Sequence, residues 1–177
     1  SPSASSSNGA GKPHTAVPDA PQPPAVPERR KPMQAVIEDL LAAYGLLAAF
    51  RSDDEFHARF EMPHFMPLVI ERIGGWRASV AHYYTQNGDA IADPDVVYDV
   101  RNWIPQEITQ PQVMLGGVVM GGYQVIITED GRYYPQRLKD VEDFSRMWAS
   151  NIREQGWLKG AKVKSISHPE LTAVAEG

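Results

Sequence analysis

The chain has 177 residues, with 17 Lys and Arg against 22 Asp and Glu, a net charge of −5 and no cysteine. This length suffices for one domain with a hydrophobic core, and the lack of cysteine excludes disulfides, thiolate catalysis and cysteine-ligated metal sites. No apolar run approaches the roughly 18 residues that span a bilayer, and the first 30 residues lack a secretion signal, so we expect a cytoplasmic protein without a membrane contact.

Residues 1–31 are rich in Pro, Ser and Ala, and their apolar side chains are no larger than Val. Such a segment buries too little surface to offset the entropy of ordering, so we predict a flexible tail or interdomain linker. It holds four basic and two acidic residues, which leaves the rest of the chain at a charge of −7. This mildly acidic remainder disfavours nucleic-acid binding, which needs clustered Lys and Arg. We place a single domain at residues 32–160, followed by a frayed segment at 161–177.

The first predicted helix covers residues 32–50, where apolar residues recur at steps of three and four. These residues are Val36, Ile37, Leu40, Leu41, Tyr44, Leu47 and Phe50. Pro32 suits the first turn, because its missing N–H has no partner there. Gly45 costs about 1 kcal/mol relative to Ala inside a helix, so the helix is predicted to end near Tyr44.

Strand patterns follow. Apolar and polar residues alternate over residues 56–62, and similar runs occupy 68–73, 77–84, 96–100 and 123–128. The two prolines within residues 62–67 indicate a loop. Residues 101–112 stay open, because Trp103 and Ile104 suit a strand or a core anchor, whereas two prolines break regularity.

Asn87-Gly88-Asp89 is a turn signal, and we treat residues 87–95 as a loop. Gly116, Gly117, Gly121 and Gly122 open no helix, so they indicate bends or bulges rather than a phosphate-binding loop.

The last predicted helix covers residues 138–155 and ends at Gly156, after which Trp157 and Leu158 can fold back onto it. Its apolar stripe consists of Leu138, Val141, Phe144, Trp148 and Ile152. The predicted fold is therefore α+β. It has an antiparallel meander sheet of five or six strands, with an N-terminal and a C-terminal helix packed on one face.

Two unusual strings carry a resemblance to a known family. Residues 79–89 read SVAHYYTQNGD, and residues 151–156 read NIREQG. With their surroundings, over residues 33–158, they resemble an uncharacterised domain of unknown function carried on bacterial plasmids, integrative elements and phages. The resemblance implies a mobile-element context, and it implies no activity, cofactor or catalytic residue.

The densest polar and aromatic cluster supplies the candidate binding residues. They are Tyr83, Tyr84, Asn87, Asp89 and Asp93, joined by Arg153 of the last helix. We expect Arg153 and Arg146 to meet the sheet groups around His82 and Tyr84 in one concave surface for a partner. Strand alternation places His82 beside Tyr84 on the helix-covered face, as a structural residue that orients the loop 87–95. Tyr83 and Asp89 are then the exposed contact groups.

A second interpretation of the same cluster is a divalent metal site. His82, Asp89, Asp93 and Asp95, with Asp99, offer one imidazole and hard oxygen ligands, which suit magnesium or manganese. Their spacing departs from that of a calcium loop, and turn chemistry explains Asn, Asp, Gly and Pro here as well. We predict no cofactor and name no catalytic residue.

The leading hypothesis is a non-enzymatic protein-interaction module, an accessory protein of a mobile genetic element that binds a host or element-encoded protein, with host-defence evasion as one role. One alternative is a metal-dependent nuclease or hydrolase that uses the Asp and His cluster. The other is a nucleic-acid-binding accessory protein that uses the basic tail and exposed aromatic residues.

Overall fold

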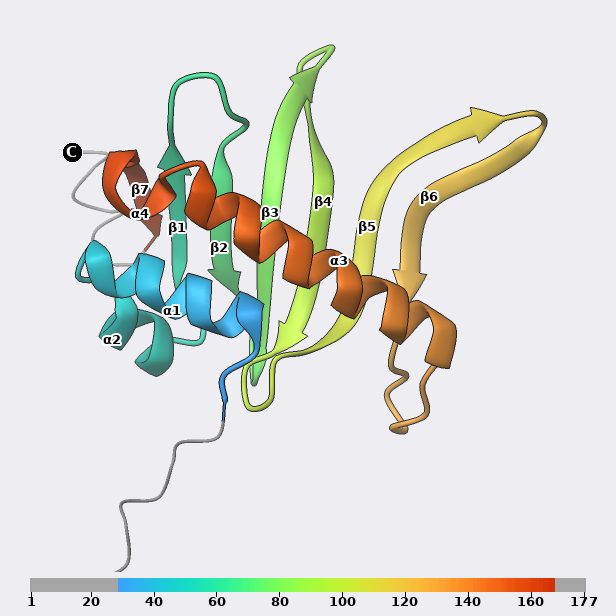
Figure 1. The fold of residues 1–177 in the computed structure, drawn as a ribbon, viewed down its shortest axis with the longest axis horizontal. Helices are drawn as coiled ribbons and strands as arrows, with labels where there is room; N and C mark the ends of the chain where they lie inside the picture. Colours follow the sequence, from blue (N-terminus) through green and yellow to red (C-terminus); the bar gives the residue numbers. More distant parts are fainter. Residues whose placement is uncertain (1–28, 168–177) are drawn as a thin grey trace, which may run out of the picture.

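The computed structural model describes residues 29–167, so most of the predicted tail at residues 1–31 lies outside the described residues. The elements are α1 (Pro32–Ala43), α2 (Leu47–Ser52), β1 (His57–Glu61), β2 (Leu68–Arg72), β3 (Arg77–Gln86), β4 (Asp89–Asp99), β5 (Ile104–Leu115), β6 (Val118–Val125), α3 (Pro135–Glu154), α4 (Trp157–Gly160) and β7 (Lys162–Ser167). The fold is α+β, as predicted (Figure 1).

Seven strands form one antiparallel sheet in the order β6-β5-β4-β3-β2-β1-β7. The prediction of five or six strands was therefore too low. One reason is β7, which falls in the segment that we expected to be frayed. It pairs with β1, with Val163 opposite Phe60, so an available sheet edge orders a short segment that has a weak pattern of its own.

Residues 104–115 form the strand β5 although it contains Pro105 and Pro111, the two prolines that left the structure of residues 101–112 open in the sequence. Pro105 lies opposite Tyr98, where the β4–β5 register shifts, and Pro111 lies in the irregularity between Gln110 and Val113. Both prolines thus occupy positions where the regular ladder is already interrupted. Trp103 precedes the strand with a positive φ of 57°, and its buried ring lies 5.5 Å from that of Tyr98, which makes it a core anchor.

The predicted loop at residues 87–95 is a tight turn followed by a strand. Asn87 and Gly88, with φ of 52° and 84°, make the turn alone, and Asp89 lies opposite Gln86 at the start of β4. Two consecutive left-handed residues match the twist of a two-residue hairpin, so no longer loop is needed.

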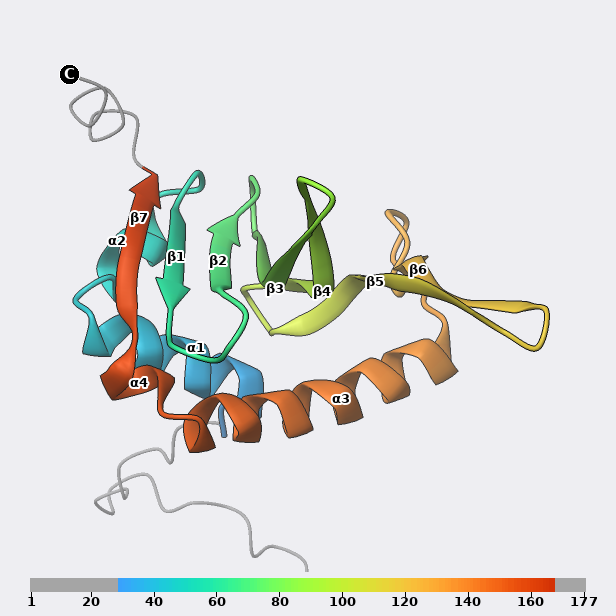
Figure 2. The same cartoon turned by 90° about the horizontal axis from the view of Figure 1, so that it is seen from above.

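The helices place the core on one face of the sheet. Figure 2 shows α1 and α3 running along the same face. The first helix breaks at Gly45, which has a φ of 73°, as the glycine predicted. From α1 the core receives Val36, Ile37, Leu40 and Leu41, from the sheet Phe60, Leu68, Ile70, Val80 and Val96, and from α3 Val141, Trp148 and Ile152. The apolar stripes read from the sequence are thus the surfaces that meet.

One part of the sheet leaves this layered arrangement. The outer part of the β5–β6 hairpin, residues 110–123, extends away from the helices and from the other strands, and we call it the arm (Figures 1 and 2). The two strands of the arm approach each other closely at Gly121, where an added Cβ would collide with the carbonyl oxygen of Pro111. Glycine is therefore required at this close approach of two backbones.

Candidate functional site

A groove lies between the second half of α3 and the ends of the central strands. It has a volume of about 310 Å³. Its lining residues are Phe65, Met66, His82, Asp93, Pro94, Gln110, Phe144, Met147, Trp148, Asn151 and Gln155. The groove thus combines side chains from the β1–β2 loop, from three strands and from α3, and of the predicted site residues it contains His82 and Asp93.

His82 lies at the floor of the groove. Its Nδ1 is 3.1 Å from the carbonyl oxygen of Met66 and 3.2 Å from that of Pro67. The centroid of its ring lies 5.6 Å from that of Trp148 and 5.8 Å from that of Trp157. Burial lowers the pKa of His82, against the smaller opposing effect of these two carbonyls. The neutral ring therefore donates from Nδ1 and fixes the β1–β2 loop, not the segment 87–95 that we predicted.

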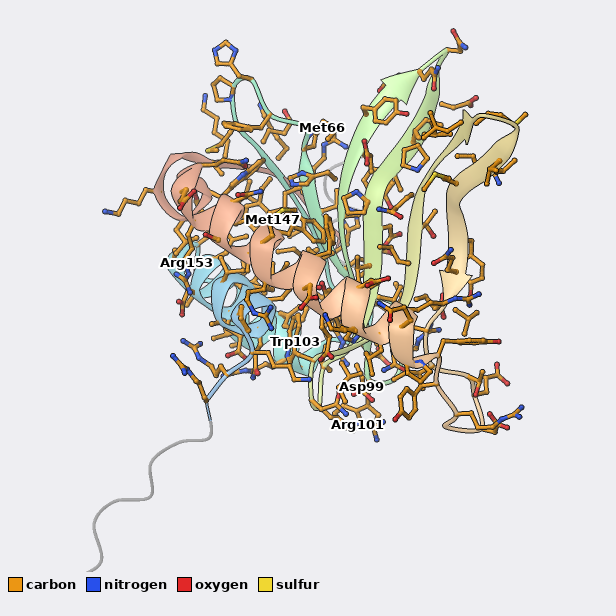
Figure 3. The ribbon with its side chains drawn as sticks, turned by 45° about the vertical axis from the view of Figure 1, so that its right-hand side comes forward. Met66, Asp99, Arg101, Trp103, Met147 and Arg153 are labelled. Atoms are coloured by element: carbon orange, nitrogen blue, oxygen red, sulfur yellow. The ribbon has the colours of Figure 1, made fainter. Side chains whose placement is uncertain are left out.

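The rim of the groove is apolar, and its polar side chains besides His82 are the Asp93 carboxylate and three amides. Phe65, Met66 and Met147 are exposed, and Figure 3 shows how Met66 and Met147 lie relative to α3. Gln110, Asn151 and Gln155 contribute side-chain amides. Amides both donate and accept hydrogen bonds, as a peptide backbone does. The groove can thus hold an extended apolar segment and satisfy part of its backbone.

A second hollow, of about 480 Å³, adjoins the groove, because Asp93 and Gln110 line both. Its other lining residues are Tyr84, Pro111, Val113, Leu115, Met120 and Gly121. Val113 lies opposite Met120 in the β5–β6 ladder, so both strands of the arm contribute one face to this hollow. The predicted candidate Tyr84 lies here.

The arm has more exposed large apolar side chains than any other helix or strand described. Val113, Met114, Leu115, Val118, Val119, Met120 and Tyr123 are each between 48% and 70% exposed. Met114 lies opposite Val119, on the face away from the second hollow, so both faces of the arm are apolar. Residues 108–128 contain no Asp, Glu, Lys, Arg or His.

Asp95 and Tyr83 lie together on the sheet face opposite the helices. The Ser79 hydroxyl donates to Asp95 Oδ1 at 2.5 Å, and Tyr83 also hydrogen-bonds this carboxyl. Burial raises the pKa of Asp95, and burial together with the nearby carboxylates raises the pKa of Tyr83 to about 12. The pair is therefore a part of the opposite sheet face, separate from the groove.

The remaining candidates lie elsewhere. Asn87 and Asp89 are exposed at the tip of the β3–β4 hairpin. Arg153 Nη2 donates to Asp39 Oδ2 of α1 at 2.7 Å, and Figure 3 shows it at the junction of the two helices. This hydrogen bond is the main cause that lowers the pKa of Asp39. Arg146 pairs with Asp143 at 3.1 Å. Neither Arg146 nor Arg153 lines the groove around His82.

The predicted metal ligands are dispersed over the sheet. His82 and Asp93 line the groove, Asp89 is at the hairpin tip, and Asp95 lies on the other face. Asp99 pairs with Arg101 at 2.8 Å, and both lie far from Met66 in Figure 3. Within the described part of the chain, no three His, Asp or Glu side chains come close enough to hold a metal ion.

Sequence reasoning missed Gln110, Met147 and the arm. The signal for the arm was present in the uncharged stretch of residues 108–128, where the consecutive apolar residues 113–115 and 118–120 place apolar side chains on both faces of a hairpin. Met147 and Asn151 are four residues apart on α3, a spacing that places them on one helix face. Nothing in the sequence indicates that Gln110 and Asp93 would join this face in space.

Across residues 29–167, every helix is too short or too polar to cross a membrane. The model of one protein family matches residues 35–158, and that family is described as a domain of unknown function, DUF6908. No curated protein and no solved structure matches the chain.

Proposed function

Since the chain belongs to the DUF6908 family, a domain of unknown function, we propose from its own groove that it is a non-enzymatic protein-interaction module. The groove beside α3 receives an extended, mainly apolar segment of another protein. As part of this proposal, the partner is a host or element-encoded protein in the cytoplasm, and the chain is an accessory protein of the mobile element that the sequence resemblance implies, with host-defence evasion as one role.

The observation that carries this proposal is the combination of an exposed apolar rim with amide groups. Met147 is 53% exposed, whereas the next residue of α3, Trp148, is only 4% exposed. The apolar rim is therefore adjacent to the hydrophobic core. Apolar anchors fix a bound segment, and a few placed polar groups orient its backbone. Asn151 of α3 and Gln110 of β5 supply such groups, together with Gln155 at the C-cap of α3, whose Oε1 also accepts a hydrogen bond from Trp157 Nε1 at 2.9 Å.

The two alternatives gain no support from this arrangement. A metal-dependent hydrolase needs its carboxylates on one metal, whereas Asp89, Asp93 and Asp95 lie at a hairpin tip, in the groove and on the opposite face. A nucleic-acid interface needs clustered free cations. The basic side chains nearest the N-terminal end of the domain, Arg30 and Lys31, instead pair with Glu38 and Glu142.

The test is capture of protein partners by the immobilised chain, compared between two matched variants of α3. Met147→Glu places a charge on the groove rim, and Ser150→Glu places the same charge at an exposed position outside the groove lining. We expect Met147→Glu to weaken capture at least tenfold and Ser150→Glu to leave it unchanged, with both variants folded by circular dichroism. Equal capture by both, or turnover of a substrate by the chain, contradicts the proposal.

A further inference from the structure

We propose that two copies of this chain associate through their arms, which makes the protein a homodimer. This inference is independent of the groove, because it concerns the arm at residues 110–123. The arm of one copy packs against the same surface of the other copy around a two-fold axis. The apolar side chains on its two faces form the contact.

The first argument is the size of the exposed surface. The seven large apolar side chains of the arm are 48% to 70% exposed. At about 25 cal/mol per Å², a fully buried Val, Leu or Met side chain corresponds to roughly 60 to 120 Å² and an aromatic one to about 150 to 250 Å², so the arm exposes on the order of 300 to 600 Å² of apolar surface over its two faces. A standard protein interface takes about 800 Å² from each partner, whereas monomers rarely expose an apolar patch above a few hundred Å². Because somewhat more than half of such an interface is non-polar, the two faces of the arm together supply most of the apolar surface that one partner contributes.

The second argument is charge. The whole chain carries a net charge of −5, and residues 108–128 contribute none of its charged groups. Two identical acidic molecules repel each other wherever charged surfaces meet, so an uncharged surface is the place where they can approach. A surface that selects a different protein generally uses complementary charges for that purpose, and the arm has none to offer. An isologous contact needs only a surface that is complementary to itself.

The third argument is the contrast between the two edge strands of the sheet. The edge strand β7 presents exposed Lys162 and Lys164, charges that discourage pairing with another chain. The opposite edge strand, β6, presents Val118, Val119, Met120 and Tyr123. One edge is thus protected against association and the other is not.

Other occupants fit the arm less well. The apolar side chains of residues 1–28 are no larger than Val, so that segment offers little surface to bury against the arm. Lys and Arg strengthen binding to a membrane surface because they attract anionic lipids, and residues 108–128 have neither. A second copy supplies the same large Val, Met, Leu and Tyr side chains in equal number.

Mass measurement by sedimentation equilibrium of the 177-residue chain tests the dimer. We expect the wild type to have twice the mass of one chain at micromolar concentration. Val119→Lys places a charge on the arm, and we expect it to raise the dissociation constant at least tenfold. Thr85→Lys places the same charge at the exposed end of the β3–β4 hairpin and is expected to leave the wild-type value unchanged. A monomeric wild type, or equal association of all three proteins, overturns the inference.

Cross-linking identifies the contact surface. The chain has no cysteine, so a single introduced thiol can pair only with the same thiol of another copy. We expect Met114→Cys to form a disulfide-linked dimer under mild oxidation, and the matched Thr85→Cys to stay monomeric on a denaturing gel. A dimer that cross-links equally through both positions, or only through Thr85→Cys, rejects the arm as the contact.

Discussion

The domain body and the arm use the same kinds of side chain in opposite ways. Leu68, Val80 and Val96 are fully buried beneath the helices, whereas Leu115, Val118 and Val119 of the arm are more than half exposed. Both sets lie on antiparallel strands of one sheet. The difference is the cover, because α1 and α3 extend over the central strands and leave the arm free (Figure 2). Apolar strands that the chain itself leaves uncovered point to a cover from another molecule.

The largest expected effect is the loss of stability when a buried side chain of the domain body is removed. Trp148→Ala removes a nearly fully buried ring that contacts Phe144 and His82, so we expect a loss of about 3 to 5 kcal/mol in the free energy of unfolding. Denaturant unfolding measures it. Met147→Ala at the adjacent exposed position is the control, expected within about 0.5 kcal/mol of wild type. Similar losses in both variants would show that Trp148 is not a core residue.

A glycine pair tests the close approach of the two strands of the arm. Gly121→Ala introduces a Cβ at 2.2 Å from the Pro111 carbonyl oxygen, whereas Gly131→Ala meets nothing within 4 Å, and both glycines have a φ of 86°. Both variants therefore have the same backbone strain, and the difference between their losses of stability measures the steric contact at Gly121 alone. We expect Gly121→Ala to lose about 1 to 3 kcal/mol more than Gly131→Ala in thermal unfolding. Equal losses would mean that the two strands of the arm do not approach so closely.

The pH dependence of stability tests the burial of His82. Because the folded protein lowers this pKa from 6.5, the unfolded chain binds the proton more readily. Stability is thus full above about pH 7 and falls as the pH drops through 6.5 towards the folded pKa, with Asp93 partly opposing the shift. We expect the thermal midpoint of His82→Gln to depend less on pH in this range than that of the wild type.

His64→Gln in the exposed β1–β2 loop is the control for that measurement. It is expected to retain the wild-type pH profile. A profile for His82→Gln that parallels the wild type from about pH 7 to about pH 5 would show that His82 is not the group that loses stability on protonation.

The smallest expected effect concerns the segment before the domain. Removal of residues 1–28 is expected to leave the thermal midpoint unchanged, because that segment has little apolar surface to bury. Removal of residues 1–31 also deletes the exposed ion pairs of Arg30 with Glu38 and of Lys31 with Glu142, each worth at most about 1 kcal/mol. A drop of several degrees after the shorter deletion would show that the segment packs on the domain.

Local patterns predicted much of the body. The periodicity of residues 32–50, the weak point at Gly45, the alternation in β1 and the strand runs of β2 and β3 appear in the structure because each depends on neighbours in sequence. Strand β7 and the continuous β5 were not predicted. The first is ordered by pairing with the distant β1, and the second continues past prolines that occupy its bulges.

The candidate site was predicted only in part, for the same reason. His82, Tyr84 and Asp93 could be selected from their local cluster, but their union with Gln110 and Met147 depends on strand order and on the path of α3. Arg153 and Asp95 were in the prediction because their residue types suit binding. Their hydrogen bonds to Asp39 and Ser79, on other elements, place them outside the groove.

Hydrogen exchange in the arm, measured at low and high protein concentration, tests the central claim most directly. The claim is that another copy of the chain covers the arm. It predicts that amides of residues 113–120 become more protected as the concentration rises, while those of residues 84–90 in the β3–β4 hairpin exchange at one rate throughout. Rapid exchange of residues 113–120 at every concentration would contradict the claim.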